Sequence, residues 1–216
     1  MRVHRLRCKS HRDTDYHVGR ILQSFLTALD QASTTPKRIL LQTGLKNYGV
    51  HQGPVSVPCD ENDPRVELGE ANFYYAQEDI LAEYCGTHPS TSWNITMPSF
   101  ILGAVKASDM TIFYPLAVYA TVQRKLGKPL AFPGDEAAWE KMLPMSSGVL
   151  NSYFHEWLVL DEGTKGESLN IVDCSDFSWL RAWPVVAGWF GMDWRPPAEE
   201  EDAKYEMVEM PLRPRG

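Results

Sequence analysis

A lysine and a tyrosine lie where acid–base chemistry is expected in an α/β protein. Lys46 follows the segment "KRILLQTG" at 37–44, and Tyr74 lies at the start of "FYYAQEDIL" at 73–81. An ammonium close to a phenol favours the phenolate and lowers the pKa of the tyrosine from about 10. Such a pair can donate a proton to a carbonyl group or stabilise an oxyanion. Spacing alone leaves a simpler interpretation open: a buried structural tyrosine and a surface lysine.

The elements around these two residues are predicted to bring them to one edge of a sheet. "KRILLQTG" is typical of a short parallel strand covered on both faces, and Lys46 comes just after its carboxyl end, where ligands bind in open parallel sheets. Asn72 is a plausible N-cap for a helix from 73 to about 85, so Tyr74 would lie in its first turn. The irregular loop at 47–71 is long enough to be functional.

The rest of the chain alternates helices with short apolar strands. This alternation predicts an α/β fold with a mainly parallel sheet and helices on both faces. The tryptophans at 139, 157, 179, 183 and 189 are expected to be core residues. Further helices are predicted at 18–29, 111–126, 147–160 and 178–191, the last interrupted or started near Pro184, and further strands at "TSWNITMP", "KPLAFPG" and "SLNIVD".

Composition excludes several classes of protein. A formal charge of −7 and a pI near 5.4 argue against nucleic acid as a partner, because phosphate binding relies on clustered cations. The four cysteines are scattered, which indicates free thiols in a reducing, cytoplasmic compartment and no metal site. No apolar run reaches the roughly 18 residues of a membrane span, so we expect no membrane contact.

Several longer segments carry a resemblance. "LLQTGLKNYGV", "NFYYAQEDIL", "GKPLAFPGDEAAW" and "SLNIVDCSDFSWLRAWPVVAGWFG" are similar, in this order, to the progesterone 5β-reductase/iridoid synthase-like (PRISE) family of atypical short-chain dehydrogenases. The resemblance runs from about Val18 to Asp193. It implies an extended Rossmann fold, NADPH as cofactor, and reduction of the activated C=C of an enone or enal, or of a carbonyl, in a small specialised metabolite.

The resemblance also assigns site residues. The match to "QTGLK" makes Lys46 the catalytic lysine, and the match to "NFYY" makes Tyr74 the catalytic tyrosine. The residue four places after Tyr74 is Glu78, so the YxxxK of most short-chain dehydrogenases is absent, in agreement with this branch. By the same resemblance, the nicotinamide would lie near Thr43, Gly44, Pro98 and Ile101, and the substrate near Phe113, Tyr114 and Tyr119.

The main departure from the family is the dinucleotide-binding half. The family carries GxxGxxG after its first strand, and the printed sequence has no such motif. We expect an atypical N-terminal tail at 1–17, a partial Rossmann-like domain with the substrate-covering helices at 18–195, and an acidic, proline-containing tail at 196–216. The remaining strands would leave an unpaired edge, which a homodimer or a partner chain would cover.

Three functions are therefore open at this point. In the first case, the chain is an oxidoreductase of the enone-reducing kind, and the complete enzyme either exists as a longer chain or is completed by another subunit. Alternatively, it keeps the Tyr74/Lys46 pair for proton transfer without a cofactor, as an isomerase or cyclase. In the third case it is an inactive remnant or a binding module.

Overall fold

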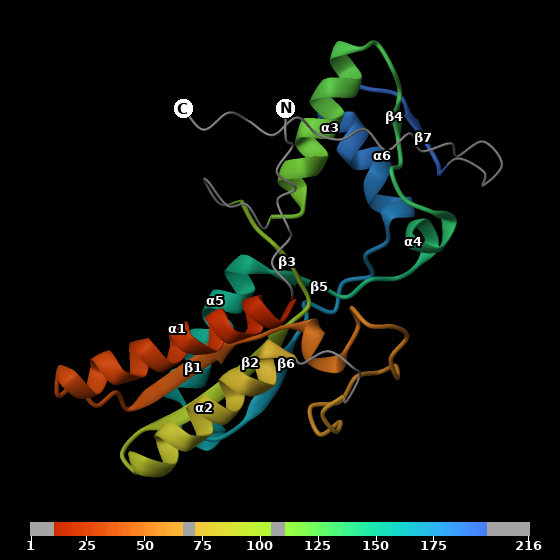
Figure 1. Ribbon diagram of the computed structural model, residues 1–216. Helices are drawn as coiled ribbons and strands as arrows, with labels where there is room; N and C mark the ends of the chain where they lie inside the picture. Colours follow the sequence, from red (N-terminus) through yellow and green to blue (C-terminus); the bar gives the residue numbers. More distant parts are fainter. Residues whose placement is uncertain (1–10, 67–71, 105–110, 198–216) are drawn as a thin grey trace, which may run out of the picture. The chain divides into compact units, whose positions relative to one another are not determined.

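A computed structural model describes residues 11–66, 72–104 and 111–197 (Figure 1). The chain divides into two compact units. The first unit consists of Met1–Thr111 with Pro144–Ser175, and the second of Ile112–Leu143 with Asp176–Gly216. The first unit contains the parallel sheet and both residues of the predicted acid–base pair.

The sheet of the first unit is parallel throughout, as predicted. Strands β1 (Arg38–Gln42), β2 (Ser92–Pro98) and β6 (Ser168–Ile171) pair in the order β1-β2-β6. Leu40 is opposite Asn94, and Ile95 is opposite Ser168. A second parallel pair joins β3 (Phe100–Leu102) to β5 (Met145–Ser147). The strands predicted from apolar runs are thus confirmed, and β2 ends at a proline.

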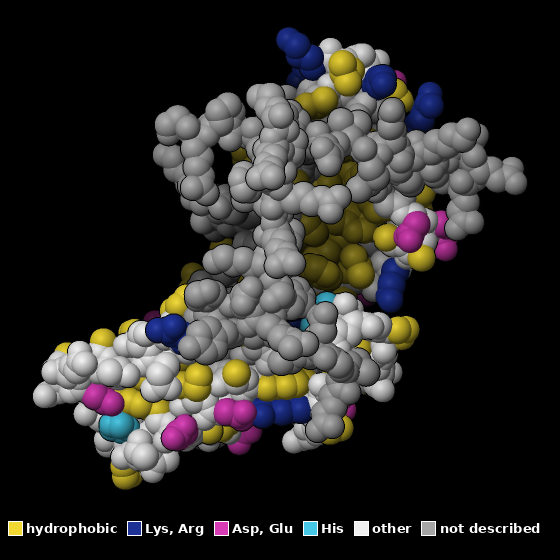
Figure 2. Space-filling model, in the orientation of Figure 1, with side chains coloured by type: hydrophobic (Ala, Val, Ile, Leu, Met, Phe, Trp, Pro, Cys, Tyr) yellow, Lys and Arg dark blue, Asp and Glu magenta, His cyan; other side chains and the backbone are white. Residues whose placement is uncertain are grey.

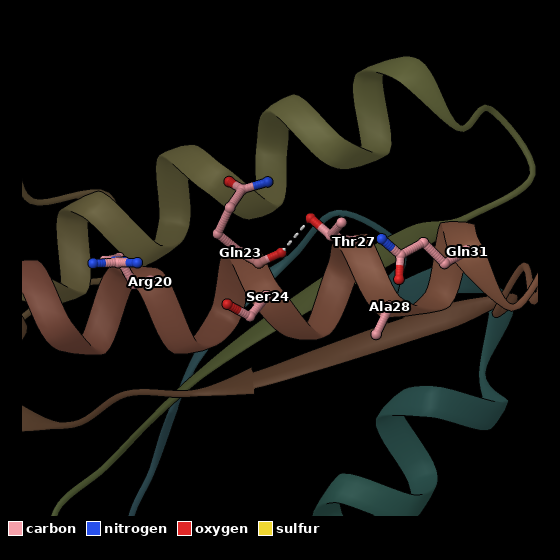
Figure 3. Close-up of a pocket in the computed structure, with 6 residues that line it drawn as sticks. All are labelled: Arg20, Gln23, Ser24, Thr27, Ala28 and Gln31. Atoms are coloured by element: carbon pink, nitrogen blue, oxygen red, sulfur yellow. Dashed lines mark hydrogen bonds between the residues drawn. The ribbon is translucent and has the colours of Figure 1, made fainter.

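Helices cover both faces of this sheet. Helices α1 (His11–Gln31) and α2 (Phe73–Thr87) lie on one side of the strands, and α5 (Gly148–Leu160) lies on the other (Figures 1 and 3). Asn72 caps α2, as predicted, because its side chain accepts a hydrogen bond from the Tyr74 amide. Helix α1 begins earlier than its apolar periodicity predicted, and residues 11–17 of the expected tail are helical.

The side chain of Arg38 fastens β1 to the end of α5. Its Nη1 donates to Asn94 Oδ1 at 2.6 Å, to the carbonyl of Leu158 at 3.1 Å and to Thr164 Oγ1 at 3.3 Å, and its Nη2 donates to the carbonyl of Asp161 at 3.1 Å. The last carbonyls of a helix lack partners within the helix, and a cation beside them also opposes the negative end of the helix dipole. One guanidinium therefore fixes α5 on the face of the sheet that it covers.

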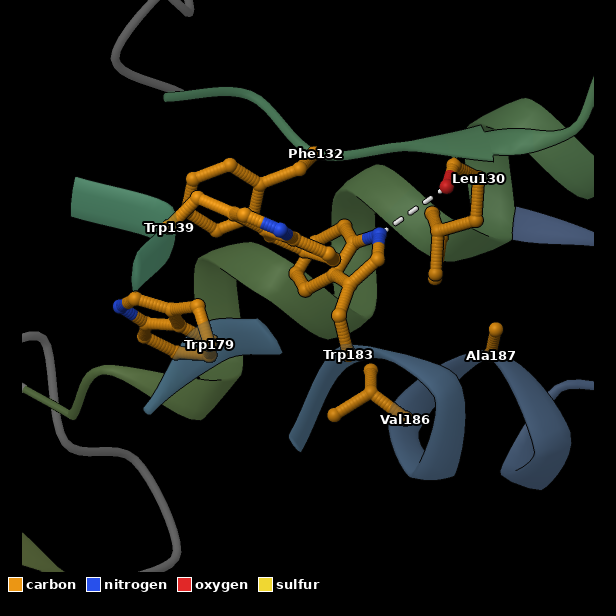
Figure 4. Packing of buried hydrophobic residues seen from close by; sticks show 8 residues of the cluster. Leu130, Phe132, Trp139, Trp179, Trp183, Val186 and Ala187 are labelled. Atoms are coloured by element: carbon orange, nitrogen blue, oxygen red, sulfur yellow. Dashed lines mark hydrogen bonds between the residues drawn. The ribbon is translucent and has the colours of Figure 1, made fainter. Parts of the chain in front are cut away.

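The second unit is built around tryptophans. It comprises α3 (Phe113–Lys125), β4 (Leu130–Ala131), α4 (Glu136–Glu140), α6 (Trp179–Trp189) and β7 (Trp194–Arg195). Trp139, Trp179 and Trp183 pack around Phe132, and Trp183 Nε1 donates to the carbonyl of Leu130 at 3.0 Å (Figure 4). Helix α6 starts well before Pro184 and continues past it, so it is neither started nor interrupted there.

The prediction that the tryptophans are core residues holds for three of the five. Trp157 is 49% exposed and Trp189 is 70% exposed, so that prediction is wrong for these two.

Helices α1 and α2 present hydrophobic side chains interspersed with acidic ones on the outer face seen in Figure 2. Across the described ranges, none of the helices combines the length and apolar character needed to cross a bilayer.

We predict that Arg38→Lys lowers the free energy of unfolding by about 1–3 kcal/mol, because a single ammonium cannot serve acceptors on both β2 and α5. Urea unfolding followed by circular dichroism measures this change. Lys37→Ala, at the exposed neighbouring position, is the matched control and should leave the transition unchanged. Equal stability of Arg38→Lys and the wild type would show that the guanidinium does not fasten α5.

Candidate active site

The carboxyl end of β1 leads directly into the turn that carries Lys46. The Thr43 amide donates to the carbonyl of Thr96 at 2.8 Å, and Thr43 Oγ1 donates to the same oxygen at 3.1 Å, which closes the end of β1 onto β2. The chain then forms a 3-10 turn at Leu45–Tyr48. Gly49 ends the turn at φ 76°, where a β-carbon would also approach Val66 Cγ1 to 3.2 Å. The conformation of Gly49 therefore contributes to the position of Lys46.

Two side chains from the start of α2 hold this turn. Asn72 Nδ2 donates to the carbonyl of Lys46 at 2.7 Å, while Asn72 Oδ1 accepts from the Tyr74 amide at 3.1 Å. The Tyr75 hydroxyl donates to the carbonyl of Asn47 at 2.6 Å and accepts from the Val66 amide at 2.9 Å. Asn72 therefore links the backbones of the two predicted catalytic residues directly. The sequence predicted Asn72 only as a helix cap.

The Tyr74 hydroxyl lies at the rim where β1 and β2 end. A β-carbon placed on Gly44 would lie 3.5 Å from the Tyr74 hydroxyl and 3.5 Å from the carbonyl oxygen of Pro98. The phenol therefore comes close to the backbone of both strands at the edge where ligands bind in parallel sheets. A glycine at position 44 keeps side-chain atoms out of the space beside the hydroxyl.

The electrostatics of this tyrosine differ from the sequence-based expectation. Burial raises the pKa of the Tyr74 phenol above its usual value, whereas a neighbouring ammonium was expected to lower it. Lys46 is exposed, and its Nζ lies 5.8 Å from the centroid of the Phe73 ring, which is itself 4.4 Å from the Tyr74 ring. Desolvation of the phenolate therefore raises the pKa of Tyr74, and the phenol keeps its proton at physiological pH.

The remaining predicted residues fall into two groups. Thr43, Gly44 and Pro98 are buried at the same rim of the first unit, and Ile101 is 38% exposed on β3. The predicted substrate residues lie on α3 of the second unit. Phe113 and Tyr119 pack against the tryptophan core, and the Tyr119 hydroxyl donates to the carbonyl of Ala131 at 3.0 Å. Tyr114 is 65% exposed. Their part in substrate binding stays a prediction.

Sequence reasoning missed the role of Tyr48. Its hydroxyl donates to Asn170 Oδ1 on β6 at 2.8 Å, and burial raises the pKa of Tyr48 to about 12. The Asn170 amide donates to Glu61 Oε1 at 2.8 Å, so the loop after Tyr48 also reaches β6. These contacts fasten the turn that carries Lys46 to the far strand of the sheet. No local pattern in the sequence indicates this contact, because Tyr48 and Asn170 are 122 residues apart.

The rim fits one end of a dinucleotide. Gly44 and the carbonyl of Pro98 present backbone beside the phenol, which suits the flat nicotinamide ring. The phosphates require a glycine-rich turn before a helix, and the printed sequence contains no GxxGxxG. The residues present therefore fit the nicotinamide end of a dinucleotide and not its diphosphate.

A shallow depression on α1 does not offer comparable chemistry. It is formed by one helix, and Thr27 Oγ1 within it donates to the carbonyl of Gln23 in the preceding turn at 2.8 Å (Figure 3). A depression lined by a single helix has no opposing wall to enclose a ligand. Its lining residues are Arg20, Gln23, Ser24, Thr27, Ala28 and Gln31.

Comparison with known proteins gives consistent relatives. The model of the PRISE-like Rossmann-fold domain matches residues 8–211. An uncharacterized protein of Schizosaccharomyces pombe is 38% identical over 179 residues, which are 81% of this chain and 44% of the relative. The 3-oxo-Delta(4,5)-steroid 5-beta-reductase of Arabidopsis thaliana is 32% identical, over 89% of this chain and 50% of the enzyme. The (S)-8-oxocitronellyl enol synthase of Nepeta racemosa is 32% identical, over 87% and 49%.

Solved structures show the same fold at low identity. UDP-glucuronic acid 4-epimerase from Bacillus cereus, in complex with UDP-glucuronic acid and NAD, has a TM-score of 0.59 at 16% identity, covering 82% of this chain and 52% of the epimerase. UDP-glucose 4-epimerase from Thermus thermophilus, in complex with NAD, has a TM-score of 0.56 at 15% identity, covering 82% and 56%. The chain spans about half the length of the curated relatives it matches.

We predict that Asn72→Asp removes one of the two hydrogen bonds of this side chain and keeps the other. The carboxylate still caps α2, but it cannot donate to the carbonyl of Lys46. The helix should keep its stability while backbone amides of the turn at 45–49 exchange faster with deuterium, by about tenfold, a loss of about 1.4 kcal/mol of local protection. Asn72→Ala should lose about 1 kcal/mol of cap stability as well. Unchanged exchange in Asn72→Asp would show that the bridge does not hold the turn.

Proposed function

The chain belongs to the PRISE-like Rossmann-fold family, and from this membership we propose that it carries the acid–base side chains of a short-chain-dehydrogenase-type oxidoreductase. The reaction is NADPH-dependent reduction of an activated C=C, or of a carbonyl, in a small specialised metabolite. The observation that carries the proposal is the position of the Tyr74 hydroxyl, next to Gly44 and the Pro98 carbonyl at the carboxyl rim of the sheet. Asn72 supports it by linking Tyr74 to the turn of Lys46.

The names of two relatives support the substrate class. One is a reductase of a 3-oxo-Delta(4,5)-steroid, a compound with a double bond next to an oxo group, and the other is an enol synthase. Both names describe a carbonyl compound whose oxygen gains electron density during reaction. A protonated phenol at the rim is suited to meet such an oxygen.

The chemistry assigned to the chain's own residues is that of a hydrogen-bond and proton donor. NADPH supplies a hydride to the β-carbon of the enone when it is bound. The electron pair of the C=C moves to the carbonyl oxygen, and Tyr74 stabilises the resulting enolate by hydrogen bonding or by giving up its proton. The Lys46 ammonium, positioned over Phe73, adds positive potential to the rim and favours the anionic oxygen. Solvent then protonates the α-carbon, and where Tyr74 has given up its proton, the O–H proton of the enol returns to Tyr74 as the carbonyl re-forms, so that one hydride and one proton are added in total.

We predict that the full chain oxidises NADPH at millimolar concentration in the presence of a small enone such as 2-cyclohexen-1-one. Tyr74→Phe should lower this rate by about 10²-fold or more, because the proton donor is removed. Tyr84→Phe is the matched control, since Tyr84 lies on the same helix with its hydroxyl on Asp30. NADPH consumption by Tyr74→Phe at the wild-type rate would contradict the proposal. Enone isomerisation without nucleotide that disappears in Tyr74→Phe would instead support the isomerase alternative.

The pH dependence of the same reaction should report the protonated phenol. Because burial raises the pKa of Tyr74, the folded chain holds this proton more tightly than an unfolded chain does. The phenol is therefore protonated below about pH 10, the ordinary pKa of tyrosine, and loses its proton only as the pH rises through the higher pKa of the folded state. The rate of enone reduction should therefore not decline between pH 7 and 9 because of Tyr74. A decline that begins between pH 7 and 9 would show that Lys46 lowers the pKa of Tyr74 instead.

A further inference from the structure

Two turns of the second unit lie side by side and form a shallow cleft. Helix α3 leads into β4 through Gly127, and α6 leads into β7 through Gly191; both glycines have a positive φ, 64° and 61°. Leu130 pairs with Trp194, and the Leu130 amide donates to the carbonyl of Asp193 at 2.8 Å. This pairing holds the two turns together, and residues of both turns line the cleft.

Cations gather at this end of the second unit. Arg124, Lys128 and Arg195 line the cleft together with Asp193, and Lys125 lies beside Arg124 in the last turn of α3. All four cations are exposed, and none of them forms an ion pair with another described residue. Figure 2 shows Lys and Arg side chains around hydrophobic ones at the top of the view, where α3 leads into β4. A chain with a formal charge of −7 therefore has a local excess of positive charge here.

An apolar row on the outer side of α3 runs up to these cations. Tyr114, Val118, Val122 and Leu126 follow one another at intervals of four residues and are 65%, 48%, 48% and 58% exposed. Residues three or four apart lie on the same side of a helix, so Lys125 stands beside Val122. We refer to this row and the four cations together as the α3 face.

We propose that the α3 face binds the surface of a lipid bilayer that contains anionic lipids. Clustered cations attract the negative surface of such a bilayer. Exposed apolar side chains on the same face enter the boundary between the headgroups and the acyl chains. Nucleic acids and soluble phosphates also attract cations, but they offer no apolar interior to Val118, Val122 and Leu126. The combination of charge and apolar surface therefore favours a bilayer.

Contact with a membrane surface differs from the expectation drawn from the sequence, which rested on the length of a spanning segment. A helix that lies along the surface needs an apolar row on one side and cations beside it, and its length does not decide. Lys125 is suited to this position, because the aliphatic stem of a lysine packs on apolar surface while its ammonium reaches the headgroups.

The acidic run at 199–202 is a competitor for the same cations. It begins four residues after Arg195, carries four carboxylates and lies outside the described residues. Its charge matches that of the four cations, so neutralising it distinguishes the two occupants. If the run holds the cations, the chain will bind anionic vesicles only when Glu199, Glu200 and Glu201 are replaced by Gln, and this result would overturn the proposal.

The test is flotation of the full chain with vesicles of phosphatidylcholine, alone or with about 30% phosphatidylserine, at about 0.1 M salt. We expect binding to the anionic vesicles to be at least about tenfold tighter than to the neutral ones, because each cation near an anionic surface contributes roughly fivefold. Equal binding to both kinds of vesicle, or binding to neither, would overturn the proposal. Binding of inositol hexakisphosphate without binding of vesicles would also overturn it, since it would assign the cations to a soluble anion.

Charge-neutralising variants locate the binding surface. Arg124→Gln with Lys128→Gln removes two cations of the cleft, while Lys37→Gln with Lys141→Gln removes two exposed cations elsewhere. Both double variants change the net charge by the same amount. We expect the first to bind anionic vesicles at least about tenfold more weakly than the second. Equal binding of the two double variants would overturn the proposal.

A polar substitution in the apolar row tests insertion into the bilayer. Leu126→Gln should weaken binding at least about threefold relative to Ile21→Gln, a control on α1 where the side chain is 71% exposed. Equal binding of these two variants would overturn insertion of the row. The wild-type chain provides a measurement that does not depend on any substitution: anionic vesicles should slow deuterium exchange of the amides at 126–128 by at least about threefold and leave those of α2 unchanged. Unchanged exchange at 126–128 on bound vesicles would contradict the assignment of the α3 face.

Discussion

The hydrogen bonds of Asn72 are the constraint on which the candidate site depends. One side chain caps α2 at the Tyr74 amide and holds the carbonyl of Lys46, which lies 26 residues earlier in the sequence. Because the turn of Lys46 follows β1 directly, this bridge also fixes the start of α2 against the carboxyl end of the sheet. A second link lies beside it: the hydroxyl of Tyr75, the residue after Tyr74, donates to the carbonyl of Asn47, the residue after Lys46. Without these bonds, the phenol and the ammonium would be carried by independent segments.

Burial then sets the chemical role of Tyr74. A phenol surrounded by Gly44, the Pro98 carbonyl and the Phe73 ring loses much of its hydration, and this penalises the phenolate more than the neutral form. Lys46 is exposed and keeps most of its own hydration. The arrangement favours a tyrosine that keeps its proton until an anionic oxygen develops beside it. A lysine-assisted phenolate, the expectation from residue types alone, would require a closer and less solvated ammonium.

Patterns of neighbouring residues predicted much of the fold, but few of the contacts between the residues of the candidate site. The apolar run at 38–42, the capping asparagine at 72 and the proline that closes β2 are signals contained in a few neighbouring residues, and the structure confirms all three. The contact of Tyr48 with Asn170 spans 122 residues, and no local pattern encodes it. The pKa of Tyr74 was predicted with the wrong sign because burial is a property of packing. The exposure of Trp157 could not be predicted either, since a tryptophan at helical spacing is usually buried.

The most direct test is a crystal structure of the chain with NADPH and an unreactive enone analogue. We expect the carbonyl oxygen of the analogue to lie about 2.6–3.2 Å from the Tyr74 hydroxyl, with the nicotinamide ring beside Gly44 and Pro98. An analogue bound at a distance from the rim, or a Tyr74 hydroxyl turned away from the bound carbonyl, would contradict the assignment of Tyr74 as the proton donor.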